Sequence, residues 1–342
     1  MQIIDPTQYP NWDDILLSTP GSNIFHTSLW ARGLKEAYGY TPKYFVEFNG
    51  GQISKLIAIM EVRSLLTGFR GVSLPFTDYC EPIFDGGIQF KELLPDIIEK
   101  GKQFGWNYLE LRGGNNLLPS GVPSVGYIGH ILALCQSEEE AFRKFRDSTK
   151  RNIKKALKEG VKVKIYDSLA SIMEFYRLNS ITRKQHGLPP QPFIFFKNVY
   201  DHIISKNLGF VILASIHEES IAGAIFFHFG EKAIYKYGAS QPRYQHLRAN
   251  NLVMWEAIRW YCQKGVKHLC FGRTEAENQG LIQFKSGWGT SEQQINYYRY
   301  DLRKDSFVSC PSKVTGFHNK IFRIMPLPLL KTLGSLLYRH IG

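Results

Sequence analysis

Apolar residues gather in short runs along this chain, and the order of these runs and of the helix-like segments between them occurs twice. The first half predicts, in order, strand 53–62, strand 71–76, helix 90–104 and strand 106–111. The second half repeats this order with strand 221–229, strand 233–237, helix 249–263 and strand 266–271. A glycine follows each helix, Gly105 and Gly265, where a left-handed backbone commonly ends a helix. The sequence therefore predicts a mixed α/β fold made of two copies of one unit, with apolar strands buried on both faces.

A polar segment separates the two copies. Ser137 and Glu140 resemble a capping box, so we expect one helix over 137–157 and a half-buried strand over 161–166. The second half of that helix is strongly basic, which is typical either of a solvated helix face or of a surface that follows phosphates. A proline-rich loop then lies between two more predicted helices, 172–184 and 193–206.

The end of the chain predicts an amphipathic helix over 329–341 that alternates basic and apolar residues. Such a helix either covers the first domain or lies on an anionic membrane surface. We therefore predict three parts: a first domain over 1–135, a second over 136–310, and a basic amphipathic tail over 311–342.

Composition limits the classes of function. Lys and Arg outnumber Asp and Glu by 42 to 30, a net charge of +12 that suits phosphate-bearing partners, although a basic soluble protein has the same balance. The five cysteines form no CxxC pair and the ten histidines no HExxH pattern, so neither a metal site nor a disulfide framework is expected. No secretory signal and no membrane-spanning run are visible, which favours the cytoplasm, with peripheral contact at the inner membrane face as an option.

Several short segments, in their joint order along nearly the whole chain, resemble the FemAB-like transferases. The segment Phe-Lys-Ser-Gly-Trp-Gly at 284–289 resembles the FKxxFG or FKxxWG signature of that family. The other matching segments are FHTSLW at 25–30, LPFTDY at 74–79, RNIKKA at 151–156 and YKYGAS at 235–240. The tail segment FRIMPLPLL at 322–330 is similar to members from exopolysaccharide and exosortase-type loci.

This resemblance implies two tandem GNAT-like (N-acyltransferase-like) domains that face each other across a cleft. It also implies an acyltransferase that passes an acyl or aminoacyl group to an amine of a cell-envelope or exopolysaccharide precursor, as better-known members do with peptidoglycan precursors. The donor is then either aminoacyl-tRNA or an acyl-CoA, and no tightly bound cofactor is expected.

Transfer to an amine needs a positioned carbonyl and a charge that stabilises the oxyanion, and it needs no covalent nucleophile. Lys285, which we expect in a glycine-flanked turn of this signature, is our first candidate for binding phosphate or stabilising the transition state. Asp78 is the candidate for orienting or deprotonating the attacking amine. The remaining candidates are side chains for binding substrate or phosphate: Tyr79, Arg112, Arg151, Tyr237, Arg243, Arg248 and Arg273. Arg112 and Arg273 follow the equivalent strands of the two copies, and each fits an ordinary salt bridge equally well.

One departure from the coenzyme A-binding pattern is visible. The segment 241–249 keeps its arginines but has no glycine, so side chains hinder a close backbone approach to a pyrophosphate. This favours a donor that is bound in another way. Two alternatives remain open: a non-catalytic module that binds RNA or a membrane with degenerate GNAT domains, and a plain acetyl-CoA-dependent acetyltransferase. The sequence does not identify the donor, the acceptor or the oligomeric state.

Overall fold

A computed structural model describes residues 1–84, 89–114, 117–118, 121–135, 137–309 and 317–342. The predicted domain boundaries lie at 135/136 and 310/311. Residues 136, 310 and 311 are outside the described ranges, and Cys310 is therefore not described. The chain forms two compact units, each assembled from separate parts of the sequence. Unit 1 contains 1–128, 293–313 and 336–342, and unit 2 contains 129–292 and 314–335.

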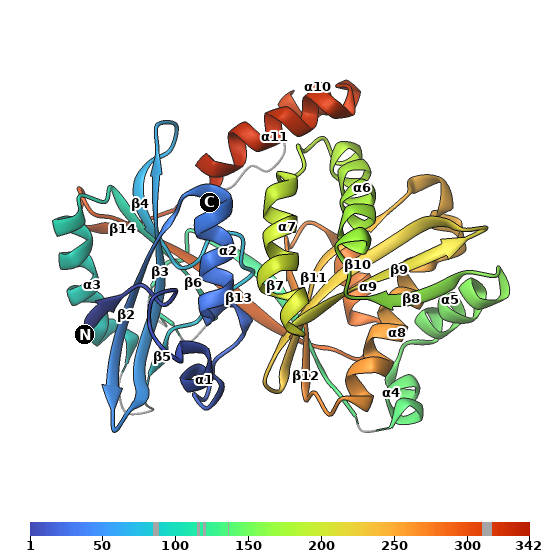
Figure 1. Cartoon of the computed structure of the whole chain (residues 1–342), viewed down its shortest axis with the longest axis horizontal. Coiled ribbons are helices and arrows are strands. Elements are labelled where there is room, and N and C mark those ends of the chain that lie inside the picture. Colours follow the sequence, from blue (N-terminus) through green and yellow to red (C-terminus); the bar gives the residue numbers. More distant parts are fainter. Residues whose placement is uncertain (85–88, 115–116, 119–120, 136, 310–316) are drawn as a thin grey trace. The chain divides into compact units, whose positions relative to one another are not determined.

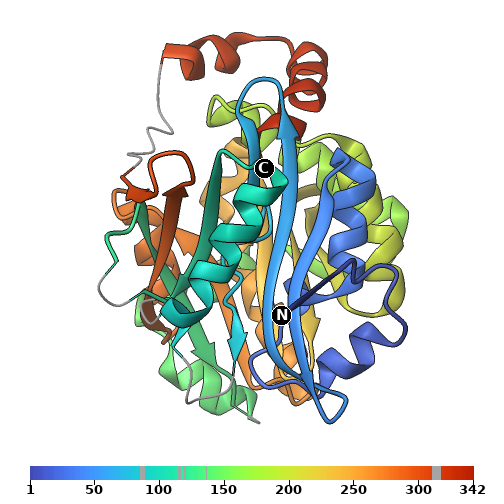
Figure 2. The same cartoon turned by 90° about the vertical axis from the view of Figure 1, so that its left-hand side faces the viewer.

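Unit 1 is a strand-rich unit with helices against its sheet (Figure 1). Its elements are β1 (Gln2–Ile4), α1 (Trp12–Leu17), η1 (Ile24–His26), α2 (Ser28–Tyr38), β2 (Thr41–Asn49), β3 (Gln52–Ser64), β4 (Gly68–Val72), β5 (Ile83–Phe84), α3 (Phe90–Phe104), β6 (Tyr108–Gly114), most of β13 (Ser291–Asp301) and β14 (Ser306–Val308). The strand order is β1-β2-β3-β4-β6-β13, with β5 beside β3 and β14 beside β13. Helix α3 lies in front of these strands in Figure 2 and buries Phe90, Leu93 and Ile97 in the core of the unit.

Unit 2 repeats this plan. Its elements are the end of β7 (Val125–Ala133), α4 (Glu138–Lys144), α5 (Asp147–Lys158), β8 (Lys162–Tyr166), α6 (Leu169–Gln185), α7 (Phe193–His202), η2 (Ile204–Lys206), β9 (Gly209–Ile216), β10 (Glu219–Phe229), β11 (Lys232–Ser240), η3 (Pro242–Leu247), α8 (Ala249–Gln263), β12 (His268–Thr274), α9 (Gln279–Ser286) and α10 (Phe317–Ile324). The helix α11 (Leu327–Ile341) begins in unit 2 and ends in unit 1. The strand order is β7-β12-β11-β10-β9-β8.

The two sheets share the pairing that the sequence repeat predicts. In unit 1, β3 and β4 are antiparallel, whereas β4 and β6 are parallel. In unit 2, β10 and β11 are antiparallel, whereas β11 and β12 are parallel. Each unit then gains one more strand from the segment that follows the other copy in the sequence. Strand β13 follows β12 of the second copy but pairs with β6 of the first. Strand β7 follows β6 of the first copy but pairs with β12 of the second. The prediction of two sibling α/β units is therefore confirmed.

Local sequence explains the repeated helices well. Helices α3 and α8 have the predicted bounds, and Gly105 and Gly265 after them have φ angles of 78° and 70°. The strand β10 is buried along most of its length because helices cover both faces of its sheet. Phe226 packs in the core that α8 covers, whereas a Cβ at Gly223 would meet Phe175 of α6 on the other face.

Three local predictions were wrong, and tertiary contacts explain each difference. The helix expected over 137–157 is two helices, because Phe145 packs against Trp255 and Trp288 and the following residue is extended. The strand expected over 71–76 ends at Val72, because Leu74 and Phe76 have positive φ angles. The strand β8 is mostly exposed rather than half-buried, since it lies at the edge of its sheet.

We expect Gly187→Ala to lower the free energy of unfolding by about 2 kcal/mol, as measured by urea denaturation. Gly187 has a φ of +68°, and a Cβ there would collide with the backbone oxygen of Asn319. The side-chain amide of Asn319 also donates a hydrogen bond to the Gly187 backbone oxygen. Gly160→Ala is the matched control, because its φ is +78° but no atom lies within 4 Å of the added Cβ. The control should lose only the cost of the left-handed backbone, about 1 kcal/mol. Equal losses in the two variants would contradict the packing argument.

Candidate functional site

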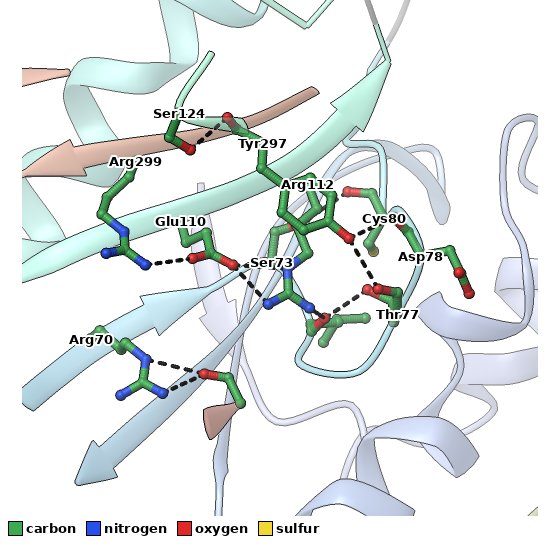
Figure 3. Close-up of polar contacts among 12 residues, drawn as sticks. Arg70, Ser73, Thr77, Asp78, Cys80, Glu110, Arg112, Ser124, Tyr297 and Arg299 are labelled. Carbon is green, nitrogen blue, oxygen red and sulfur yellow. Dashed lines mark hydrogen bonds and ion pairs between the residues drawn. The ribbon is translucent and has the colours of Figure 1, made fainter. Parts of the chain in front are cut away.

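In unit 1, the candidate residues surround the loop 73–80, which leaves the end of β4 (Figure 3). Leu74 and Phe76 have φ angles of 54° and 60°, an uncommon conformation for side chains of this size. Such backbone persists only where surrounding contacts impose it. The contacts around this loop therefore fix its backbone in this conformation.

Several side-chain hydrogen bonds hold this loop. Arg112 Nη1 donates to the Leu74 oxygen at 3.0 Å, and Thr77 Oγ1 donates to the same oxygen at 2.6 Å. Ser73 Oγ donates to the Cys80 oxygen at 3.0 Å. The Tyr297 hydroxyl donates to the Asp78 oxygen at 2.7 Å. These contacts fix the backbone on both sides of Asp78.

Arg112 is buried on β6 and makes an ion pair with Glu110, two residues away on the same face of the strand. The shortest distance, from Arg112 Nη2 to Glu110 Oε1, is 2.7 Å, and Arg299 Nη2 lies 3.1 Å from Glu110 Oε2. The guanidinium of Arg112 also lies 5.0 Å from the centre of the Tyr297 ring. The sequence allows Arg112 to be either a phosphate-binding residue or part of a salt bridge. This geometry favours the salt bridge, and the same side chain donates to the Leu74 oxygen of the loop.

The other candidates of unit 1 lie on the loop itself. The carboxylate of Asp78 points away from Arg112 in Figure 3. Tyr79 is half-buried against a small core that contains Tyr127, Ile295 and Tyr297. Burial raises the pKa of the neighbouring Cys80 thiol, so this cysteine stays protonated at neutral pH and is a poor nucleophile.

In unit 2, Lys285 lies at the end of helix α9 rather than in the glycine turn that the sequence suggested. The side chain is 2% exposed. Its Nζ donates to the backbone oxygens of Gly272 and Arg273 at 2.9 and 3.1 Å. A buried ammonium is therefore fixed at the end of β12, an edge where open α/β sheets commonly bind ligands.

The surrounding signature residues explain why Lys285 is fixed there. Trp288 is fully buried beside Phe145 and Phe284, with ring centres 5.0 and 5.9 Å away. A Cβ at Gly287 would meet Thr149 of α5 at 2.5 Å, so only glycine allows this approach. The signature at 284–289 thus anchors α9 against α5 and β12.

His130 of β7 is a buried neighbour that sequence reasoning missed. Burial, together with the positive charge of Lys285, lowers the pKa of His130, and Glu292 opposes this shift from 3.5 Å. The imidazole is therefore neutral at pH 7. No short motif marks this histidine in the sequence, because its surroundings come from distant segments.

A cavity of about 260 Å³ lies in unit 2 at the start of helix α8. Its lining includes Arg248, Asn250 and Asn251 at the helix end and Leu281 and Phe284 of α9. Arg248, the N-cap residue, is left-handed with a φ of 60°, and no side chain caps this helix. The first N–H groups of a helix lack partners within it and carry partial positive charge. The cavity therefore suits an anionic group, and Lys285 follows directly after one of its lining residues.

The remaining candidates of unit 2 lie at different places. Arg243 bonds to Glu219 and to the Gln241 side chain, next to the cavity. Arg151 is exposed on α5. Tyr237 packs edge-on against Phe195 and Phe196 of α7. The structure thus brings Lys285 to the backbone of Arg273, whereas Arg243 and Arg248 lie near opposite ends of η3.

Within the part of the chain that the structure describes, no group of three or more Cys, His, Asp and Glu side chains is placed to hold a metal ion. None of the described helices is both long enough and apolar enough to cross a bilayer.

Comparisons with known proteins agree with this fold. The sequence model of the family described as "Acetyltransferase (GNAT) domain" matches residues 143–286, a range that ends one residue after Lys285. A curated relative, the Lipid II:glycine glycyltransferase of Staphylococcus haemolyticus (strain JCSC1435), is 21% identical over 51% of this chain. The match covers 58% of that relative, so the chain spans little more than half of its length.

Two solved structures have a similar fold. The crystal structure of FemX has a TM-score of 0.66 and 15% identity, and the match covers 86% of this chain and 96% of that one. A tandem GNAT protein from the clavulanic acid biosynthesis pathway has a TM-score of 0.52 and 9% identity, with coverage of 85% and 94%. The family model, the relative and the shared fold agree with the resemblance found in the sequence: residues 143–286 match a GNAT acetyltransferase domain, and the fold is that of two tandem GNAT-like units.

Proposed function

We propose that this protein is an acyltransferase that passes an acyl or aminoacyl group to an amine of a cell-envelope or exopolysaccharide precursor. The observation that carries the proposal is the buried ammonium of Lys285, fixed at the end of β12 within the segment that the GNAT model matches. The name of the curated relative, a glycyltransferase acting on lipid II, supports aminoacyl transfer and a peptidoglycan precursor as one acceptor.

The proposed step is a direct displacement. The amine nitrogen attacks the donor carbonyl carbon, a C–N bond forms, and the C–O bond of an aminoacyl-tRNA or the C–S bond of an acyl-CoA breaks. The amine loses one proton, and the departing alcohol or thiol gains one. Lys285 stabilises the negative charge that develops on the carbonyl oxygen, a task for which a preorganised, buried cation is well suited.

The donor phosphate is proposed to bind at the start of α8, in the cavity lined by Arg248 and Asn250. The uncapped helix end and Arg248 supply positive charge there. Arg243, Arg151 and Arg273 are proposed as further anion contacts, and Tyr237 as a donor-side hydroxyl. Because side chains replace the glycines of a coenzyme A loop, we favour aminoacyl-tRNA over acyl-CoA as the donor.

The loop of unit 1 is proposed to serve the acceptor. Asp78 orients the amine and accepts its proton, and Tyr79 contributes a contact to the acceptor. Arg112 acts as a positioning residue, because its hydrogen bond to Leu74 and its ion pair with Glu110 hold the loop that carries Asp78. The cytoplasmic location stays a prediction.

The direct test of the activity is the mass of the acceptor. Purified protein is incubated with a peptidoglycan precursor bearing a free amine and with either glycyl-tRNA or acetyl-CoA. We expect the acceptor to gain the mass of one glycyl group with the first donor. A gain of one acetyl group only would establish a plain acetyltransferase. Tight tRNA binding without any product would favour the non-catalytic binding module instead.

We expect Arg248→Gln to raise the KM for the donor by about five- to ten-fold and to leave kcat nearly unchanged, since a phosphate contact acts on binding. Lys264→Gln is the matched control, because Lys264 caps the opposite end of the same helix α8. Steady-state kinetics at two salt concentrations measure both variants. A fall in kcat at unchanged KM, or an equal effect in the control, would contradict a phosphate site at this helix end.

A further inference from the structure

The end of the β3–β4 hairpin and the C-terminal helices carry an unusual share of the exposed apolar side chains. Among the described residues, fourteen large hydrophobic side chains are exposed, and half of them lie in these two segments. The members are Leu65, Leu66, Ile321, Ile324, Leu329, Leu336 and Ile341. Scattered single apolar residues are normal on a protein surface, whereas such a concentration marks an interaction site.

Within unit 1, the hairpin tip and the end of α11 form one surface (Figure 2). Thr67 Oγ1 donates to the His340 backbone oxygen at 2.6 Å, and Ser64 Oγ lies 3.1 Å from His340 Nδ1. The buried Arg70 donates to the same His340 oxygen at 3.0 Å. The hairpin tip therefore stays attached to the helix end.

Several apolar side chains near these hydrogen bonds are exposed to solvent. Leu65 is 100% exposed and Leu66 is 67% exposed, whereas Leu336 and Ile341 of α11 are 62% and 56% exposed. Leu330 and Tyr338 are buried on the side of α11 opposite Leu336, whereas Ile341 is exposed at the end of the helix. The helix thus has one face against the protein and apolar residues on a second, exposed face.

The charge of the tail favours one kind of partner. No Asp or Glu occurs after Asp305, whereas Lys313, Lys320, Arg323, Lys331 and Arg339 all follow it. Lys320 and Arg323 are exposed on α10 beside the exposed Ile321 and Ile324. Aliphatic side chains that alternate with basic ones, without acidic neighbours, match the boundary between acyl chains and anionic headgroups.

We propose that the hairpin–tail surface, made of the β3–β4 tip and residues 336–342 at the end of α11, binds the surface of an anionic lipid bilayer, and that the basic helix α10 adds a separate contact. Leu65, Leu66, Leu336 and Ile341 enter the headgroup–acyl boundary, and the basic residues of the tail contact the lipid phosphates. The surface brings the protein to a membrane through peripheral contacts. The inference concerns binding and does not depend on the proposed transfer chemistry.

Co-sedimentation with vesicles tests this proposal. Pure phosphatidylcholine vesicles are compared with vesicles that contain phosphatidylglycerol, at low and high salt. We expect binding to the anionic vesicles, weakened by salt, and little binding to the neutral ones. The double variant Leu65→Ser/Leu66→Ser should lower the binding constant by at least ten-fold. The double variant Lys320→Glu/Arg323→Glu should lower it by a similar factor and remove the preference for anionic lipid.

Two matched controls isolate the surface. Leu157→Ser/Met173→Ser removes two exposed apolar residues from α5 and α6, and Lys154→Glu/Lys155→Glu reverses two exposed charges on α5. Both controls should bind vesicles like the wild type, and circular dichroism should show that all variants are folded. Absence of vesicle binding, or equal losses in variants and controls, would overturn the proposal. If the hairpin–tail variants lost binding to tRNA but still bound vesicles, the proposal would be overturned, and RNA would be the partner of this surface.

Discussion

Lys285→Met is expected to lower kcat for the transfer reaction by about 100- to 1,000-fold. Removal of one preorganised donor to a developing oxyanion typically has an effect of this size. The ammonium of Lys285 is buried and held by two backbone oxygens, so its orientation needs no reorganisation during the reaction. Rapid-quench measurement of acceptor acylation under single-turnover conditions gives the rate of the chemical step.

The same contacts also give Lys285 a structural role, and the experiment must separate the two. A donor titration and a thermal melt of Lys285→Met are therefore measured with the kinetics. The account predicts that donor affinity changes by less than about three-fold in the folded fraction, whereas the rate collapses. If the variant were folded and kept full turnover, Lys285 would have no part in the mechanism. If the rate fell only in proportion to the unfolded fraction, Lys285 would have a structural function alone.

Glu110→Gln is expected to lower the free energy of unfolding at pH 7 by about 3 kcal/mol, because it leaves buried Arg112 without its carboxylate partner. The glutamine also weakens the contact to Arg299. Urea denaturation at pH 7 measures this loss. Glu47→Gln is the control, since the ion pair of Glu47 with Lys55 is more exposed and screened by water, so its loss should change the free energy of unfolding far less.

The effect of Glu110 has a definite dependence on pH. Burial alone raises the pKa of this carboxyl, but Arg112 and Arg299 outweigh it and lower the pKa below the ordinary value of 4.5. The unfolded chain then binds a proton before the folded one does. The stabilisation is therefore complete above about pH 4.5 and is lost as the pH falls through the lowered value. A difference between wild type and Glu110→Gln that grew on acidification would contradict this ion pair.

Local signals in the sequence predicted the fold well. The repeated helices ended where glycine allows a left-handed residue, and the apolar runs gave the strands on either side. The break at Phe145 had no local signal, because it depends on Trp255 and Trp288 from distant parts of the chain. The exchange of β7 and β13 between the sheets was invisible for the same reason.

The candidate site was only partly visible in the sequence. The signature around Lys285 was found, but the burial of its ammonium depends on β12. The pair of Glu110 and Arg112 was detectable, since residues two apart on a strand share a face. Tyr297 and His130 were missed because eighteen tyrosines and ten histidines offer no means of choosing among them without contacts.

We propose that the donor binds in unit 2, between the start of α8 and helix α9. The measurement that tests this most directly is photo-crosslinking with a minihelix that mimics the aminoacylated end of tRNA and carries a diazirine on its acyl group. The labelled peptides are mapped by mass spectrometry, with and without excess unlabelled aminoacyl minihelix. We predict competable labels within 245–251 or 281–285. Competable labels found only elsewhere, with both of these segments unlabelled, would contradict the proposed site.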